Sequence, residues 1–317
     1  MNKLALLISP QARSAYFADY LIVARSEFQQ LFGDRELVYR DVGPLEFFEL
    51  EAEESEQQVL LRLSFVQGLF RIDGDRLQPL AQQADFHLHP DFVFGSKFKG
   101  KTNEHLTQLL INVGLAELGI DPTNPSGIKL LDPMCGRATT LLWAMRYGLN
   151  SKGLEQDAKA LDDIQRNLKK WTKLHRQKHK LSQGTITGQK RKSAGKFLDF
   201  SAEQTSLRVI SGDARDADQL LKKDKFDLLV CDLPYGVQHF TTDKTRNPLD
   251  VIRQCAPVWR HCLKQQSALV LAFNSNNPKR AAMIEAFESQ GYRATDFSAA
   301  HRMSESIVRD VLILRPS

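Results

Sequence analysis

From Gly127 to the C-terminus, short apolar runs alternate with longer segments in which apolar residues recur at helical spacing. The runs that read as strands are IKLLDPM, SKGLEQD, LRVISGDARDA, FDLLVCDLPYG, SALVLAFN and two runs within residues 292–317. Strands that alternate with helices predict a mostly parallel sheet with helices on both faces. We therefore expect an α/β fold for this part of the chain.

Residues 1–85 predict a small accessory domain of the α+β type. LALLIS reads as a short strand and residues 9–32 as a helix with Pro10 in its first turn, followed by the strands ELVYRDV, LEFFELEA and QQVLLRLSFVQGLFRID. Residues 1–82 contain eight basic and thirteen acidic residues, so we do not expect this domain to hold nucleic acid by charge alone. The second domain is expected to span residues 86–317.

The composition is that of an ordinary globular protein, with 42 % apolar and 26 % charged residues. No segment approaches the length of a membrane span, and the N-terminal apolar run is too short for a signal peptide. The cysteines are Cys135, Cys231, Cys255 and Cys262, and none of them forms a C-x-x-C pair. This pattern favours a reduced, cytoplasmic protein without a zinc site or a disulfide framework.

The connector at residues 86–104 carries His87 and His89 in an H-x-H pattern. Such a pattern could place both rings on one face of a strand. No further ligand is apparent near them in the sequence, and an isolated H-x-H pair is a weak metal signal. We interpret both histidines as structural and expect no metal site.

Basic residues are concentrated in one segment. Residues 164–198 contain eleven Lys and Arg and no Asp or Glu, so that the rest of a chain of net charge +5 carries −6. This asymmetry favours a polyanion partner, and the alternative is a solvated loop without a partner. Residues 172–205 read as a flexible insertion, since stretches such as SQGTITGQKRKSAGK are rich in Ser, Gly, Thr and Lys.

Carboxylates end four of the expected strands: Asp132, Glu155, Asp213 and Asp232. Parallel sheets bind ligands beyond the carboxyl ends of their strands. Cys135 and Gly136 open a helix and let the backbone approach a ligand, Glu155 can accept from both ribose hydroxyls, and Asp213 can accept from an adenine amine beside the Ala214 backbone. Each acid taken alone could equally be a helix cap or a loop residue.

Together these features describe a nucleoside pocket. The chain has neither a G-x-G-x-x-G fingerprint nor a P-loop lysine, so there is no clear cradle for a pyrophosphate. A nucleoside without phosphates favours S-adenosylmethionine as the cofactor. The candidate cofactor-binding residues are Asp132, Met134, Cys135, Gly136, Glu155, Asp213 and Ala214.

The segment LLVCDLPYG supplies the candidate catalytic residues Asp232, Leu233, Pro234 and Tyr235. Leu233 precedes a proline and is therefore held near extended geometry, which can aim its carbonyl outward. The Asp232 carboxylate and this carbonyl can accept two hydrogen bonds from one NH₂ group, and Tyr235 offers a face on which a base can stack. The alternative is a turn with a surface tyrosine.

These motifs resemble those of a known enzyme class. DLPYG resembles motif IV, (D/N)-P-P-(Y/F), of class I S-adenosylmethionine-dependent amino-methyltransferases, and DPMCGRATT resembles the motif I DPMCGSGT of the THUMP-associated RNA guanine-N2 methyltransferases. KGKTNEHLTQLLINVGLA resembles the helix that precedes motif I in that group. The resemblance covers residues 86–317. It implies a Rossmann-like seven-stranded sheet that ends in a reversed hairpin, and methyl transfer to N2 of guanosine, usually in tRNA.

The sequence departs from the family pattern in two places. Arg137 and Ala138 stand where motif I usually has Ser and Gly, and Leu233 replaces the first proline of motif IV. Ala138 narrows the space near the methionine part of the cofactor. In an RNA enzyme the basic insertion would be an RNA-binding element, with Lys190, Arg191 and Lys192 as candidate contacts.

Two alternatives to the RNA enzyme remain open at this point. Motif IV also serves DNA adenine-N6 and cytosine-N4 methyltransferases, and the altered motif I would suit a non-catalytic RNA-binding protein that keeps the fold. Covalent catalysis by a cysteine is not favoured, because an attacking amine needs no such nucleophile. Cys231 is poorly placed for it, since in an alternating strand it points away from the side that Asp232 faces, and Cys135 lies in the cofactor loop.

Overall fold

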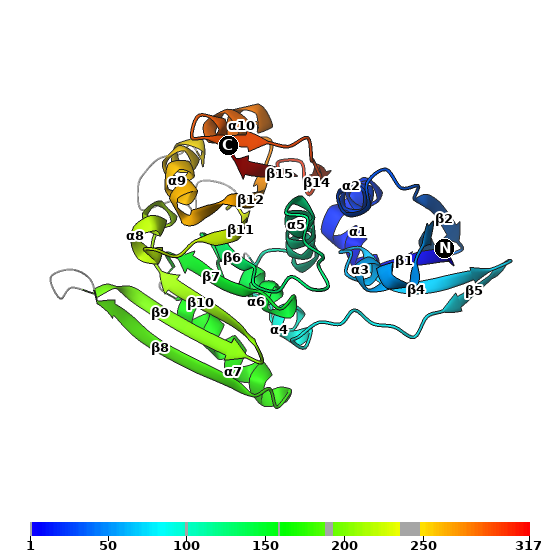
Figure 1. The fold of residues 1–317 in the computed structure, drawn as a ribbon, viewed down its shortest axis with the longest axis horizontal. Coiled ribbons are helices and arrows are strands. Elements are labelled where there is room, and N and C mark those ends of the chain that lie inside the picture. The colour runs from blue at the N-terminus through cyan, green and yellow to red at the C-terminus, as the bar shows by residue number, and fades with distance from the viewer. Residues whose placement is uncertain (1, 99–100, 158, 188–192, 235–247) are drawn as a thin grey trace.

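The structure is a computed structural model, which describes residues 2–98, 101–157, 159–187, 193–234 and 248–317. Tyr235 and the three candidate RNA contacts Lys190, Arg191 and Lys192 lie outside the described residues. Two sheets make up the fold (Figure 1).

The N-terminal sheet has five antiparallel strands in the order β2-β3-β1-β4-β5. Its elements are β1 (Asn2–Ile8), α1 (Pro10–Tyr16), η1 (Phe17–Asp19), α2 (Tyr20–Phe32), β2 (Val38–Val42), β3 (Leu45–Ala52), η2 (Glu54–Glu56), α3 (Gln57–Leu61), β4 (Val66–Asp73) and β5 (Arg76–Pro79). The expected α+β character of this part is confirmed.

Two predictions in this part were wrong in detail. The single helix expected over residues 9–32 is broken, because Phe17 adopts a φ of 52° and a 3-10 turn separates α1 from α2. The first part of QQVLLRLSFVQGLFRID is the helix α3 rather than a strand. The Glu53 and Glu56 side chains form a capping box on the turn before α3, which favours a helix there.

The second sheet has ten strands in the order β13-β15-β12-β11-β6-β7-β10-β9-β8, with β14 paired to β15. Its strands are β6 (Lys129–Asp132), β7 (Asn150–Glu155), β8 (His179–Thr187), β9 (Ser193–Ala202), β10 (Thr205–Ser211), β11 (Phe226–Asp232), β12 (Leu263–Asn274), β13 (Tyr292–Ala294), β14 (His301–Arg302) and β15 (Val308–Pro316). The strands β10, β7, β6, β11 and β12 are parallel, and β15 runs antiparallel to them. The expected seven-stranded, Rossmann-like sheet with a reversed C-terminal hairpin is therefore present from β10 to β13.

Helices cover both faces of this sheet (Figure 1). They are α4 (Asp91–Phe94), α5 (Glu104–Glu117), α6 (Thr139–Arg146), α7 (Ala160–Leu174), η4 (Ala214–Asp216), α8 (Ala217–Leu221), α9 (Pro248–Cys262) and α10 (Arg280–Glu288). Apolar side chains of α5, α6 and α7 join one core, and those of α8, α9 and α10 join a second core. Among the described residues, no helix is both long and apolar enough to cross a membrane.

The segment expected to be a flexible insertion is largely a hairpin. β8 and β9 pair antiparallel from His179↔Ala202 to Thr187↔Ser193, and β9 extends the sheet beyond β10. Leu198 and Phe200 on β9 are buried. Alternate side chains of β9 are buried, and their packing stabilises a strand. The expectation of flexibility, which rested on the polar, glycine-containing composition, was therefore wrong for most of this segment.

The N-terminal part packs on the larger sheet through helices, chiefly α2 against α5. Buried residues of α2 and α5 belong to the same apolar core. The buried carboxylate of Glu27 on α2 accepts a hydrogen bond of 2.7 Å from the Asn112 amide on α5. The Asp19 carboxylate accepts a bond of 2.8 Å from the backbone N–H of Arg302 on β14. The two sheets are thus joined by both apolar and polar contacts.

Candidate active site

The carboxyl ends of β6, β7 and β10 meet at one edge of the larger sheet. Asp132 lies opposite Gly153, and Ser211 lies opposite Glu155. The loops beyond these strands are tied together, since the N–H of Cys135 donates to the carbonyl of Leu154 and that of Gly212 to the carbonyl of Glu155. Three of the predicted strand-end carboxylates, those of Asp132, Glu155 and Asp213, are therefore brought to neighbouring positions.

The loop after β6 has the backbone shape that close ligand approach requires. Gly136 has a φ of 52°, and a Cβ placed there would meet no heavy atom within 4 Å. Ala138, the residue before α6, also adopts a left-handed conformation with a φ of 65° although it carries a side chain. Strain of this kind is typical of functional loops. The open space beside Gly136 is the accessible side of the loop.

Glu155 at the end of β7 binds this loop directly. One carboxylate oxygen accepts from the N–H of Gly136 at 2.8 Å, and the other accepts from the N–H of Asp157 at 2.7 Å. Burial raises the pKa of Glu155, although the two backbone hydrogen bonds and the charge of Arg137 oppose that effect. Each oxygen keeps a second lone-pair direction, so the carboxylate can still accept from a ligand.

Arg137 turns away from the loop toward the start of α7. Its guanidinium lies 2.8 Å from the Asp157 carboxylate and 3.1 Å from that of Asp163. The departure from the family motif at this position is thus accommodated by two acids. These contacts tie the loop between β6 and α6 to α7.

Asp213 is already strongly engaged. Its carboxylate accepts from the backbone N–H of Arg215 at 2.9 Å and contacts the guanidinium of the same residue at 2.8–3.2 Å. Burial opposes a low pKa, but these hydrogen bonds outweigh it and the pKa of Asp213 is lowered. Neighbouring Ala214 is buried and its carbonyl accepts from the Trp259 indole at 3.1 Å. An adenine amine would have to compete with Arg215 for Asp213.

Asp232 at the end of β11 has a basic partner that the sequence reasoning missed. A guanidinium nitrogen of Arg309 on β15 lies 3.7 Å from its carboxylate, and the two side chains are 5 % and 8 % exposed for Arg309 and Asp232. The available signal was the pair Arg309-Asp310 inside the apolar strand IVRDVLIL, because charged residues are rarely buried without partners.

Asp132 lies beside Asp232 but is more deeply buried. Burial is the largest cause that raises the pKa of Asp132 to about 7; the charge of Asp232 acts in the same direction, and the hydrogen bond from the N–H of Met134 opposes it. At neutral pH a fraction of Asp132 is therefore protonated. Asp132 is best suited to holding the loop, and Asp232 is the more accessible of the two.

Leu233 and Pro234 follow Asp232 directly, at the point where β11 ends. The N–H of Leu233 donates to the carbonyl of Ala272 at 2.9 Å, which fixes the backbone at this point. Among the described residues, none donates a hydrogen bond to the Leu233 carbonyl. Pro234 is partly exposed. The position of Tyr235 lies outside the described residues and stays a prediction.

The thiols near this edge do not suit nucleophilic chemistry. Cys135 and Cys231 are buried, and burial raises the pKa of both thiols well above the ordinary value. A reactive cysteine needs a lowered pKa and an electropositive setting. The geometry therefore gives no support to the covalent alternative.

The connector histidines have partners that the sequence did not reveal. His87 contacts the Glu203 carboxylate at 3.0 Å, while the Asp91 carboxylate lies 3.5 Å from His89 and 2.9 Å from His175. The rings of His89 and His175 stack with an interplanar angle of 21° and centroids 3.6 Å apart. One ligand atom from each of His89, Asp91 and His175 lies within 4.8 Å of the others, so these three side chains form a group that could hold a metal ion. The sequence did not indicate this grouping, because His175 and Asp91 are far apart in the chain, and the expected absence of a metal site stays a prediction.

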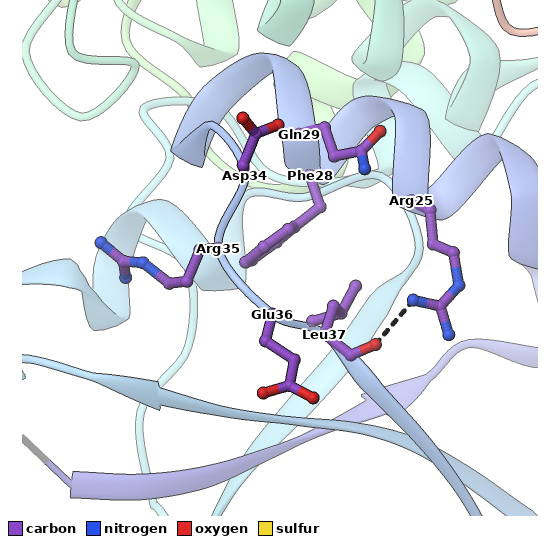
Figure 2. A pocket seen from close by; sticks show the side chains of 7 residues that line it. All are labelled: Arg25, Phe28, Gln29, Asp34, Arg35, Glu36 and Leu37. Carbon is purple, nitrogen blue, oxygen red and sulfur yellow. Dashed lines mark hydrogen bonds between the residues drawn. The ribbon is translucent and has the colours of Figure 1, made fainter.

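A surface hollow of about 450 Å³ lies between α2 and the segment that leads from α2 to β2. Figure 2 shows its lining residues, which are Arg25, Phe28, Gln29, Asp34, Arg35, Glu36 and Leu37. The Arg25 guanidinium donates to the Leu37 carbonyl at 2.6 Å across it. None of the candidate site residues lies in this hollow.

Comparison with protein families gives one match that covers more than half of the chain. The family model described as RMKL-like, methyltransferase domain, matches residues 123–301. This range contains the strand-end residues from Asp132 to Pro234. None of the curated proteins matches the chain.

Solved structures with this fold include TrmN from Thermus thermophilus, which is 11 % identical, with a TM-score of 0.53 and all of both chains covered. This likeness shows that the fold is shared along the full length. A second structure is the T. thermophilus 16S rRNA N2 G1207 methyltransferase RsmC in complex with AdoMet and guanosine. It is 17 % identical, with a TM-score of 0.42, and the match covers 100 % of this chain and 66 % of that one.

Proposed function

Because the chain belongs to the RMKL-like methyltransferase family and is an S-adenosylmethionine-dependent methyltransferase, we propose that it methylates N2 of guanosine in RNA, with tRNA as the first substrate to test. The observation that carries the proposal is that the buried Asp232 carboxylate at the end of β11 is followed directly by Leu233, to whose carbonyl no described residue donates a hydrogen bond. We assign these two groups the role of an acceptor pair for the target amine.

The residues present fit the cofactor. Gly136 offers a left-handed backbone with open space beside it, and Glu155 keeps acceptor capacity on both oxygens for ribose hydroxyls. When bound, S-adenosylmethionine supplies an electrophilic methyl group on a sulfonium. The Asp132 carboxylate accepts a hydrogen bond from the N–H of Met134 and so holds the loop at its start. The N–H of Cys135 donates to the carbonyl of Leu154, which joins the loop to β7. Asp213 and Ala214 are assigned to the adenine end, where Arg215 competes for the carboxylate.

The acceptor pair would orient the target amine. An exocyclic NH₂ group donates one hydrogen to Asp232 and the other to the Leu233 carbonyl, which leaves the nitrogen lone pair directed at the methyl group. Bound S-adenosylmethionine would give up its methyl group and leave as the neutral thioether, and Asp232 or water would accept the proton that the methylated nitrogen releases. Positioning of this kind is the main source of rate enhancement for a displacement reaction.

The choice of guanosine in RNA rests on the motifs and on charge. DPMCGRATT and DLPY resemble the motifs of RNA guanine-N2 enzymes, and eleven cations without an acid lie in residues 164–198. A basic segment attracts the phosphate backbone of any nucleic acid, so charge alone does not separate RNA from DNA. Tyr235, Lys190, Arg191 and Lys192 keep their proposed roles in base stacking and RNA contact.

The test is nucleoside mass spectrometry on RNA from cells that lack this gene, with tRNA and rRNA separated. We expect N2-methylguanosine to be lost from one RNA, and to return with the wild-type gene but not with Asp232→Asn. The Asn side chain keeps the shape but replaces one acceptor by a donor, which repels the target amine.

A matched variant and a second analysis make the test decisive. Asp310→Asn, which changes a buried acid on β15, should restore the modification wherever the protein accumulates normally. Analysis of DNA from the same cells covers the adenine-N6 and cytosine-N4 alternatives. Loss of a methylated base from DNA alone would contradict the proposal, and unchanged nucleosides in both would favour the non-catalytic alternative.

A further inference from the structure

Between residues 166 and 173, one face of α7 carries basic side chains along two turns, and the exposed acid Asp162 precedes them by one turn. Arg166, Lys169, Lys170 and Lys173 follow one another at spacings of three and four residues and are all exposed. We call these four residues the α7 basic face. The exposed residues Arg176, Lys178 and Lys180 continue it into β8.

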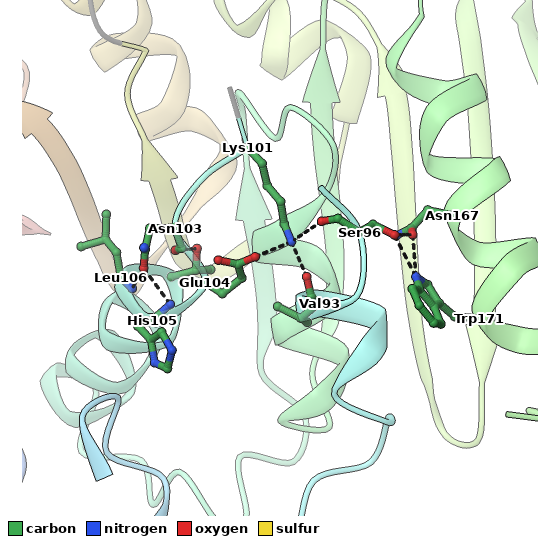
Figure 3. Close-up of polar contacts among 10 residues, drawn as sticks. Val93, Ser96, Lys101, Asn103, Glu104, His105, Leu106, Asn167 and Trp171 are labelled. Carbon is green, nitrogen blue, oxygen red and sulfur yellow. Dashed lines mark hydrogen bonds and ion pairs between the residues drawn. The ribbon is translucent and has the colours of Figure 1, made fainter. Parts of the chain in front are cut away.

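The opposite face of α7 is fully used for packing. Its buried residues are Ala160, Leu161, Ile164, Asn167, Leu168, Trp171 and Thr172. Figure 3 shows how Trp171 and Asn167 also anchor the connector, since the indole N–H donates to Asn167 at 2.7 Å and to Ser96 at 2.9 Å. The helix is therefore held in one rotation about its axis, and the α7 basic face points to solvent.

The charge of this face is hardly compensated within the protein. Arg166 lies 3.5 Å from Asp163, while among the described residues neither Lys169 nor Lys173 has an acidic partner. Lys170 lies over the Trp171 ring at 4.1 Å. Favourable interaction with the helix dipole accounts for cations in the last turn, but Arg166 and Lys169 lie in the middle of the helix. Like charges at these spacings repel each other and lower helix stability.

We propose that the α7 basic face is the surface on which the substrate RNA places its phosphate backbone. This inference rests on the proposed function and adds the contact surface to it. Exposed, uncompensated cations in a row attract a polyanion by release of its counterions. From Arg166 to Lys173 the helix rises by about 10 Å, which corresponds to about three nucleotides of one strand of a duplex.

The face also begins close to the candidate active site. Asp163 contacts both Arg166 and Arg137, and Arg137 belongs to the loop that follows β6. An RNA on the α7 basic face therefore runs from the cofactor loop toward the end of α7. The tip of the β8–β9 hairpin is not required for this contact.

The experiment compares two full-length variants with the same charge change. The first carries Lys169→Gln, Lys170→Gln and Lys173→Gln. Gln has a helix propensity close to that of Lys, and Arg166 is kept because Asp163 links it to the site. The second carries Lys3→Gln, Lys129→Gln and Lys223→Gln, which change three exposed lysines on other elements. The probe is a fluorescently labelled, unmodified tRNA transcript, with duplex DNA of equal length as competitor.

We expect the α7 variant to bind the transcript at least about tenfold more weakly and to reduce the salt slope of log K by about 2 to 3, whereas the control variant changes little. The calorimetric Kd for S-adenosylmethionine should be unchanged in both. Equal tRNA affinity and salt slope in the two variants would overturn the inference.

Methyl transfer and competition separate the two proposals. If both variants bind the transcript equally well and both methylate it at saturating RNA, the proposed binding surface is wrong but the proposed function stands. If the α7 variant binds RNA more weakly than the control variant but no protein methylates RNA, the binding surface stands and the proposed function is wrong. Preferential displacement by duplex DNA would overturn the assignment to RNA.

Discussion

A guanidinium nitrogen of Arg309 lies 3.7 Å from the carboxylate of Asp232, and both side chains are more than nine-tenths buried. Arg309 comes from the reversed strand β15, and Asp232 from the central strand β11, with β12 between them. Such a contact places a guanidinium beside the carboxylate and helps to fix the direction of that carboxylate. The C-terminal strand therefore takes part in shaping the proposed acceptor for the target amine.

Substitution of Arg309 should affect turnover more than cofactor binding. For Arg309→Gln we expect kcat to fall by about tenfold to a hundredfold, because Asp232 loses the group that positions it. Arg309→Lys should restore part of the rate, and the Kd for S-adenosylmethionine should stay within about twofold of wild type. Steady-state kinetics and calorimetry measure both quantities.

The control for this prediction is Arg280→Gln. Arg280 binds the Asp310 carboxylate at 2.7 Å and the Phe297 carbonyl at 2.6 Å, so its loss damages the same strand without touching Asp232. It should lower the melting temperature but leave kcat near wild type. An equal loss of kcat in both variants would mean that Arg309 acts through general stability.

The two predicted ribose and adenine acceptors should differ in their effect on cofactor affinity. Glu155→Gln should raise the Kd for S-adenosylmethionine by about tenfold or more, because a Gln NH₂ would face the N–H of Gly136 or Asp157 and disturb the loop. Asp213→Asn should change the Kd less than about threefold, since Arg215 already occupies that carboxylate. Isothermal titration calorimetry of both variants measures the two Kd values. If Asp213 carries the adenine contact, Asp213→Asn should raise the Kd more than Glu155→Gln does.

Ala138 stores backbone strain that glycine would relieve. A residue with a side chain in the left-handed conformation destabilises the folded state by about 1–2 kcal/mol. Glycine removes this strain, but its greater conformational freedom in the unfolded chain offsets about half of the stabilisation. Ala138→Gly should therefore raise the free energy of unfolding by up to about 1 kcal/mol and leave cofactor binding intact. Ala144→Gly in the middle of α6 is the matched control and should lower it by about 1 kcal/mol or more in urea titrations.

The sheet of the larger domain could be predicted from the sequence because its signals are local. IKLLD, VISGD and LLVCD each combine an apolar run with a terminal acid, and parallel topology brings such ends to one edge. The positions of Asp132 and Glu155 follow from that rule alone. The pairing of Gly136 with Glu155 at 2.8 Å fits the expected loop but needed coordinates to appear.

Partners that are distant in the chain could not be predicted in the same way. Arg309 reaches Asp232 across β12, and His175 reaches Asp91 from the end of α7. Nothing in one sequence ranks these pairs above other choices of acid and base. The β8–β9 hairpin was missed for a different reason. The glycines and lysines of this segment predicted flexibility, whereas the alternating apolar residues Leu198 and Phe200, which are buried in the structure, indicated a strand.

The buried carboxylate of Glu27 should make stability depend on pH. It is 0 % exposed and accepts hydrogen bonds from the N–H and hydroxyl of Ser64 and from the Asn112 amide. Burial outweighs these bonds and raises its pKa from 4.5 to about 7. A pKa raised in the folded state stabilises the protein fully below pH 4.5, and that contribution is lost as the pH rises through 7.

Between pH 5.5 and pH 8 the loss from Glu27 should be about 2 kcal/mol. Asp132, whose pKa is also raised to about 7, adds a loss in the same window. Urea unfolding of the wild type and of Glu27→Gln at both pH values isolates the part due to Glu27. The Gln variant should be less stable at pH 5.5, because its NH₂ group faces the donors of Ser64, yet it should lose about 2 kcal/mol less than the wild type on going to pH 8. Parallel pH dependence in the two proteins would show that Glu27 is ionised throughout and that the three hydrogen-bond donors outweigh its burial.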